Sequence, residues 1–147
     1  MTKSKDKPIG LTKDTGWQIG VRRTVPVDGK YAWDVITSIE GLKIWLCGDS
    51  EFDPSTSKPL NKGQSYRLKD GTTGTMRVFK PYSHLRITWH PVGWPRVSTI
   101  QVRVLNNQEK SVIVFHQEHI PGPEEREDRR EFYLRAIKKL KLLLNVK

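Results

Sequence analysis

The chain is poor in cysteine and has no long apolar run. Its single cysteine, Cys47, excludes an internal disulfide and gives no sign of an oxidising compartment. No apolar stretch approaches the ~18–20 residues that a membrane-spanning helix needs. The N-terminal segment Met1–Lys13 is polar and basic and lacks the apolar centre of a secretory signal. These absences predict a cytoplasmic protein without membrane insertion.

Motifs of the common cofactor and nucleophile sites are also missing. There is no G-x-S-x-G, no phosphate-binding glycine loop and no dinucleotide fingerprint. His84 and His90 share a strand face but lie ~20 Å apart at ~3.3 Å per residue. His116 and His119 point to opposite faces if their strand continues, and Cys47 has no partner cysteine. We therefore expect neither a metal nor a cofactor.

What is present is a chain of 147 residues with 35% hydrophobic and 29% charged residues and a net charge of +10. This length predicts a single domain over residues 15–147, preceded by a flexible basic leader over residues 1–14. The excess of lysine concentrates in the leader and in the C-terminal segment, without interleaved aromatics. We therefore expect the charge to be solvated rather than to mark a nucleic-acid surface.

The C-terminal segment from Gly122-Pro123 onward predicts one long amphipathic helix. Proline fits a first helical position because its missing N–H would be unpaired there. Acidic residues follow at the positive end of the helix dipole, and lysines gather near the other end. The helix needs a partner surface about 35 Å long at ~1.5 Å per residue. Its apolar face comprises Phe132, Tyr133, Ala136, Ile137, Leu140, Leu143 and Leu144.

The preceding residues alternate as strands, with two short helices between the first and second. Asp28 and Ser38 are positioned to cap these two helices, and Gly48 to end the second. Asp70-Gly71 and Asn106-Asn107 are predicted as hairpin turns. The expected strands are residues 17–25, 66–69, 74–79, 84–90, 100–104 and 112–119. The order predicts an α+β protein in which a curved antiparallel sheet of about six strands surrounds the long helix.

This order, with particular residues in it, resembles the START/birch-pollen-allergen-like (SRPBCC) superfamily and its helix-grip fold. Within it, the branch named after the activator of the heat-shock-protein-90 ATPase is the most similar. The resemblance covers about residues 16–146. The residues that carry it are Trp45-Leu46, Gly74–Val78, Leu85–Trp89, Ser111–Glu118 and Phe132-Tyr133 after an acidic helix start.

The resemblance implies a cavity between the sheet and the C-terminal helix that binds a hydrophobic small molecule, lipid-like or polycyclic aromatic. Such pockets are apolar with a few polar groups. Two other functions stay open: a cyclase, dehydratase or hydrolase that uses the same cavity, and a protein-interaction module of the chaperone-cofactor kind. The branch's namesake has a further chaperone-binding domain, and the short leader here does not match it. The candidate ligand-binding residues are Trp33, Trp45, Phe52, Tyr66, Met76, Trp89, Val102, His116, Glu118, Phe132, Tyr133 and Ala136.

His116 and Glu118 lie two apart on one strand and therefore share a face. Turned inward, they would orient a ligand hydroxyl or act as an acid–base pair. Turned outward, they would stabilise the strand end, and Ile113 and Phe115 would take the interior. The alternation of this strand does not decide between the two, because its first residues are apolar on both faces.

Overall fold

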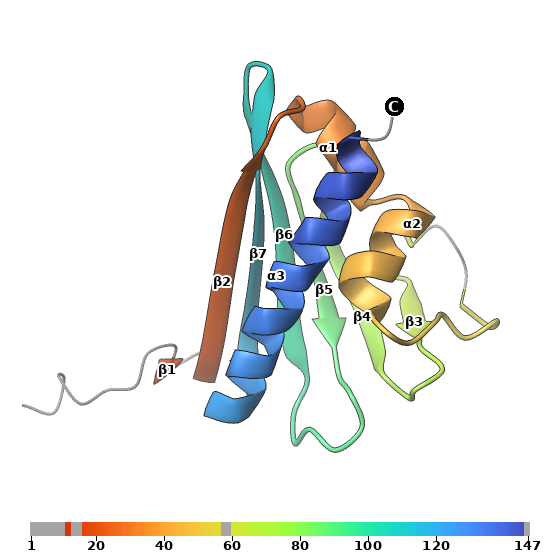
Figure 1. Ribbon diagram of the computed structural model, residues 1–147. Coiled ribbons are helices and arrows are strands. Elements are labelled where there is room, and N and C mark those ends of the chain that lie inside the picture. Colours follow the sequence, from red (N-terminus) through yellow and green to blue (C-terminus); the bar gives the residue numbers. More distant parts are fainter. Residues whose placement is uncertain (1–10, 13–15, 57–59, 146–147) are drawn as a thin grey trace, which may run out of the picture.

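The computed structural model describes residues 11–12, 16–56, 60–145 of the chain, and Figure 1 shows their arrangement. A long helix lies across one face of a curved sheet, and two short helical segments lie beside it on the same face. The elements are β1 (Leu11–Thr12), β2 (Gly16–Val25), α1 (Gly29–Ile36), α2 (Ile39–Leu42), η2 (Lys43–Cys47), β3 (Ser65–Arg67), β4 (Thr73–Lys80), β5 (His84–Trp89), β6 (Ser98–Asn107), β7 (Lys110–Ile120) and α3 (Pro123–Asn145).

All strand pairs are antiparallel, in the order β1-β2-β7-β6-β5-β4-β3. The six predicted strands are present and the α+β helix-grip architecture is confirmed. A seventh, β1, pairs Thr12 with Gly16 at the sheet edge and lies within the predicted leader. The other leader residues lie outside the described part of the chain. β7 is paired on both sides, as its apolar sequence predicts.

The short helices begin as their capping residues predict. The Asp28 carboxylate accepts a hydrogen bond from the Tyr31 backbone N–H at 2.8 Å, and the Ser38 hydroxyl accepts one from Gly41 at 3.1 Å. α2 continues into η2, a single π-helical segment, and Gly48 ends it at a φ of +62°. A residue with a side chain rarely adopts this backbone conformation, so glycine is the natural stop.

One hairpin differs from the prediction. β6 extends through Asn107, which pairs with Lys110, so the turn residues are Gln108 and Glu109 rather than Asn106-Asn107. Gln108 adopts the positive φ, 60°, that the tight connection requires. Asn106 has another role, because its side-chain oxygen accepts a hydrogen bond from the Gly29 N–H at 2.7 Å at the start of α1.

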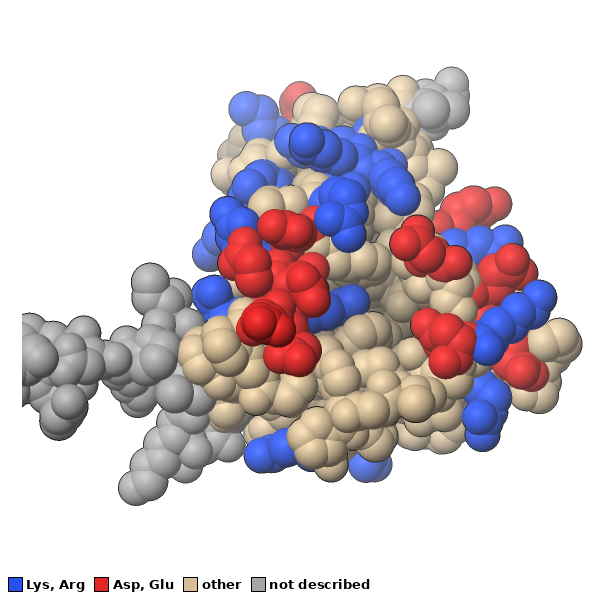
Figure 2. Space-filling view, turned by 60° about the horizontal axis from the view of Figure 1, so that its bottom comes forward, with Lys and Arg blue, Asp and Glu red and all other residues tan. Residues whose placement is uncertain are grey.

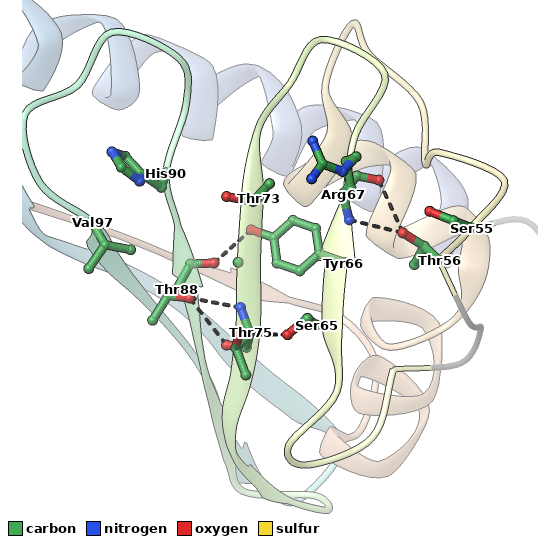
Figure 3. Close-up of a pocket in the computed structure, with 11 residues that line it drawn as sticks. Ser55, Thr56, Ser65, Tyr66, Arg67, Thr73, Thr75, Thr88, His90 and Val97 are labelled. Carbon is green, nitrogen blue, oxygen red and sulfur yellow. Dashed lines mark hydrogen bonds between the residues drawn. The ribbon is translucent and has the colours of Figure 1, made fainter.

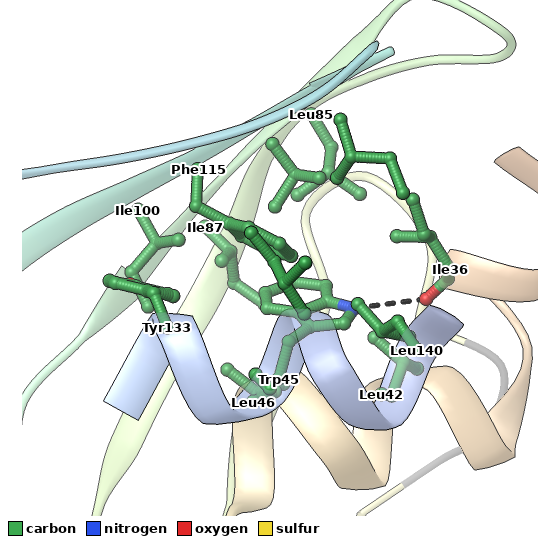
Figure 4. Close-up of a cluster of buried hydrophobic side chains, with 14 of the residues drawn as sticks. Ile36, Leu42, Trp45, Leu46, Leu85, Ile87, Ile100, Phe115, Tyr133 and Leu140 are labelled. Atoms are coloured by element: carbon green, nitrogen blue, oxygen red, sulfur yellow. Dashed lines mark hydrogen bonds between the residues drawn. The ribbon is translucent and has the colours of Figure 1, made fainter. Parts of the chain in front are cut away.

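α3 begins at Pro123, and its buried residues lie along the predicted face with one addition, Arg129. The space between α3 and the sheet is largely filled by aliphatic side chains and three rings (Figure 4). Trp45, Phe115 and Tyr133 are all fully buried. Tyr133 stacks on Phe115 at 5.1 Å between ring centroids, and Trp45 lies tilted against Phe115 at 5.9 Å. The expected cavity is therefore largely occupied by the protein's own side chains.

No helix in the described part of the chain is both long and apolar enough to cross a membrane.

Candidate functional site

The inner face of β7, which faces α3, carries Ile113, Phe115 and Gln117, all fully buried. The alternate residues turn to the outer face, where His116 shares a hydrogen bond with the Gln18 side chain at 2.8 Å. The sequence left both orientations of His116 and Glu118 open, and the structure has the outward one: the two residues line a hollow of ≈ 180 Å³ on the outer face and not the space beneath α3. They form no acid–base pair beneath α3.

The other predicted ligand-binding residues lie in or against the core. Trp89 and Phe132 are half-buried and pack against it. The fully or nearly fully buried ones are Trp33, Trp45, Phe52, Tyr66, Met76, Val102, Tyr133 and Ala136. Most of these side chains fill the interior rather than leave it open, which the sequence pattern does not distinguish.

A pocket of ≈ 200 Å³ remains between η2 and the middle of α3, and we call it the η2–α3 pocket. Three predicted residues line it: Trp89, Phe132 and Ala136. The space-filling view, with the bottom of Figure 1 turned forward, shows acidic side chains in two separate groups, with mostly uncharged surface and some basic side chains between and around them (Figure 2). The remaining lining residues are Ile44, Leu46, Cys47, Gly48, Asp49, Arg129, Arg135 and Lys139.

Arg129 is the unexpected member of this pocket, because it is only 7% exposed. Its Nε donates to the Gln117 side-chain oxygen at 2.9 Å, and its Nη2 donates to the Tyr133 hydroxyl at 3.2 Å. Tyr133 in turn donates to the same Gln117 oxygen at 2.6 Å. The Gln117 amide donates to Ser98 at 2.9 Å, and Ser98 donates to the Trp89 carbonyl at 2.6 Å. This buried polar network links α3 to β5, β6 and β7.

Three aromatic rings surround the guanidinium of Arg129. Its central carbon lies 3.9 Å from the Trp89 ring centroid, 4.3 Å from that of Phe132 and 4.9 Å from that of Tyr133. Ring faces carry partial negative charge and attract a cation. Burial raises the pKa of Tyr133 although Arg129 acts in the opposite direction. The phenol therefore stays protonated near neutral pH and keeps its role as a donor to Gln117.

Arg129 and Gln117 were not among the predicted site residues. The apolar face of α3, extended one turn back from Tyr133, reaches Arg129, and this spacing is the signal that was available in the sequence. Gln117 lies two residues after Phe115 and shares its face, but that face is identified only when the position of α3 over β7 is known.

A second and larger hollow of ≈ 520 Å³ lies on the outer face at the β3–β4–β5 end of the sheet (Figure 3). We call it the hydroxyl hollow, because serine and threonine side chains dominate its lining. It is lined by Ser55, Thr56, Ser65, Tyr66, Arg67, Thr73, Gly74, Thr75, Thr88, His90 and Val97.

Much of the polar lining of the hydroxyl hollow is already hydrogen-bonded within the protein. Ser65 and Thr75 share a bond of 3.0 Å, and the Thr88 hydroxyl accepts one from the Thr75 N–H at 2.7 Å. The Tyr66 hydroxyl donates to the Thr88 carbonyl at 2.6 Å (Figure 3). Burial raises the pKa of Tyr66 well above its ordinary value, so this donor persists.

In the described part of the chain, no three His, Cys, Asp or Glu side chains come together in a way that could hold a metal ion. The chemistry available at the η2–α3 pocket is therefore that of a cationic donor, ring faces and aliphatic walls. Such an arrangement can bind and orient a small molecule.

Neither a protein-family model nor a curated protein matches the sequence. Among solved structures, CalU16 from Micromonospora echinospora is 17% identical, with a TM-score of 0.70 over 92% of this chain and 82% of CalU16. DynU16, from the dynemicin biosynthetic locus, is 16% identical with a TM-score of 0.71. The match covers 88% of this chain and 47% of DynU16, so this chain spans about half of that protein.

An HSP90 activator from Plasmodium falciparum is 16% identical, with a TM-score of 0.67 over 88% of this chain and 96% of the activator. At these identities the comparisons show the fold. The chain therefore has the helix-grip fold that its sequence resemblance implied, and it shares this fold with CalU16, DynU16 and an HSP90 activator.

Proposed function

We propose that this protein binds a hydrophobic small molecule in the η2–α3 pocket. The helix-grip fold is the one that the resembled superfamily uses for small ligands, which it holds between sheet and long helix. The observation that carries the proposal is that a pocket persists at this place while fully buried side chains such as Trp45, Phe115 and Tyr133 occupy neighbouring space. Its walls combine the Trp89 and Phe132 rings with the Ala136 methyl group.

The volume of the pocket limits the size of the ligand. Its ≈ 200 Å³ is less than the about 300–1,000 Å³ of pockets for drug-sized ligands, but a cavity of about 150 Å³ is enough for benzene. We therefore favour a molecule with one or two rings, or one end of a longer lipid-like or polycyclic compound. Burying about 100 Å² of apolar ligand surface would contribute roughly 2.5 kcal/mol before association costs.

The enzyme alternative relied on His116 and Glu118, and both lie on the face opposite the pocket. The protein-interaction alternative would be favoured by a continuous exposed apolar patch. Among the residues that the structure describes, the exposed large hydrophobic ones are instead distributed over the β4–β5 turn, the β5–β6 loop, β6 and α3. They are Tyr82, Val92, Val97, Leu105 and Leu142. Ligand binding is the function that the geometry supports best.

The proposal is tested by NMR titration of the full chain with a set of one- and two-ring aromatic compounds. We expect a binder to shift the Trp89 indole and Ala136 methyl signals first. The variant Ala136→Leu fills part of the pocket, so it should weaken binding, and Leu142→Ala on the exposed side of the same helix should not. A folded Ala136→Leu protein with unchanged affinity, or no binder in the set, would reject the proposed site.

A further inference from the structure

Arg129 is a buried cation for which the described part of the chain supplies no carboxylate partner. It is 7% exposed, and neither ion pair found among the described residues includes it. Burying a charge is unfavourable unless it is paired and hydrogen-bonded. Arginine keeps its positive charge in proteins, so the carbonyl oxygen of Gln117, the Tyr133 hydroxyl and the surrounding rings compensate it only in part.

The uncompensated side of this cation belongs to the η2–α3 pocket. Arg129 lines the pocket, and within the described part of the chain its Nη1 has no hydrogen-bond partner, because the bonds run from Nε and Nη2. Trp89 lines the same pocket, and its indole Nε1 is buried without an acceptor among those residues. Buried donors are nearly always paired. Of these two donors, only Trp89 Nε1 is fully buried; Arg129 Nη1 is not, so it is the donor that the pocket leaves open to a ligand.

The rim of the pocket is also mainly positive, like Arg129. Arg135 and Lys139 lie on its α3 side, against one carboxylate, Asp49. With Arg129, the lining therefore carries three positive charges and one negative charge. Lining charges of one sign raise the local concentration of ligands of the opposite sign.

We propose that the ligand of the η2–α3 pocket is an aromatic carboxylate, whose carboxylate oxygens accept hydrogen bonds from Arg129. The ring of the ligand packs against Phe132 and Ala136. A carboxylate suits the site because it is small enough for ≈ 200 Å³ together with a ring system. Hydrogen bonds between guanidinium and carboxylate are also among the strongest in proteins. This inference rests on the proposed function and names its ligand class.

The test compares 2-naphthoate with 2-naphthamide, which share the ring system and nearly the same shape but differ in charge. Isothermal titration calorimetry on the full chain should give a Kd for the carboxylate at least about tenfold lower, as a hydrogen bond to a charged group implies. In Arg129→Met this preference should disappear. In Arg135→Gln, which removes a rim charge, most of it should remain.

A second readout in the unmodified protein keeps the test independent of variant folding. The Arg129 Nε–H and Trp89 Nε1–H signals should shift with 2-naphthoate and shift less with 2-naphthamide. Equal affinity for both probes at this pocket would overturn the carboxylate inference and leave the proposed function standing. A preference for the carboxylate that persists in Arg129→Met would place the anion elsewhere on the basic surface and overturn it too. Binding of neither probe would reject both proposals.

Discussion

Replacing Trp45 with alanine tests whether the interior between sheet and α3 is packed as densely as the structure indicates. Trp45 is fully buried, its indole N–H donates to the Ile36 carbonyl at 2.9 Å, and its ring rests against Phe115 (Figure 4). Trp45→Ala removes the largest side chain type from this space. The loss of buried surface and the resulting cavity should lower the free energy of unfolding by about 3–5 kcal/mol.

The lost hydrogen bond to Ile36 adds about 1 kcal/mol, which brings the total to roughly 4–6 kcal/mol of the 5–15 kcal/mol typical of a domain. Trp45→Phe retains most of the volume and should lose less than half as much. Urea unfolding followed by circular dichroism measures both values. Indole, which matches the deleted side chain, should restore about 2.7 kcal/mol at a concentration of 100 times its Kd.

A loss below about 1.5 kcal/mol in Trp45→Ala, with no response to indole, would refute this reasoning. It would mean that the ring occupies a loosely filled space and that the open cavity extends well beyond the η2–α3 pocket. In that case the size limit on the ligand would no longer hold.

Three further predictions concern single residues. Gly48→Ala should lower the free energy of unfolding by about 1–3 kcal/mol in a urea titration, because the backbone there is in a glycine conformation; its new methyl group would also lie 2.8 Å from Phe132 and should weaken probe binding. An unchanged stability would contradict the strain. Burial holds the pKa of Tyr66 well above its ordinary value of 10.0, so above pH 10 the unfolded chain loses this proton while the folded one keeps it, and stability should fall. Tyr66→Phe should reduce the steepness of that fall by about 1.4 kcal/mol per pH unit; equal pH slopes would argue against it. The pKa of His84 is lowered mainly by burial and, to a smaller extent, by the positive charges of Arg103, Lys80 and Arg86. An NMR titration of Arg103→Gln should therefore show a higher pKa for His84 than in the unmodified protein. An unchanged pKa would exclude the contribution of the Arg103 charge.

Local sequence signals predicted the framework of this fold well. Asp28, Ser38 and Pro123 mark helix starts by mechanisms that depend only on neighbouring residues, and the structure confirms all three. The structure also confirms the apolar face predicted for α3, because a helix of this length must bury one face. The turn predicted at Asn106-Asn107 lies instead at the next two residues. Either position can close a hairpin, and the pairing between β6 and β7 decides which one is used.

The site was less predictable because its chemistry depends on which faces meet. β7 is apolar on both sides at its start, so its sequence did not show whether Phe115 or His116 faces inward. Arg129 is buried only because Gln117 and the Trp89 ring, from distant parts of the chain, surround it. The capacity of the pocket likewise depends on how far Trp45 and its neighbours fill the interior, and residue spacing does not encode that volume.

The position of a bound probe tests the central claim most directly. Isotope-filtered NOE spectra of the full chain with 2-naphthoate would identify the protons that touch the ligand. We expect contacts from the naphthalene ring to the Ala136 methyl group, Phe132 and Leu46, all of which line the η2–α3 pocket. Contacts to Thr75 and Val97 instead, in the hydroxyl hollow on the opposite face, would contradict a ligand site beneath α3.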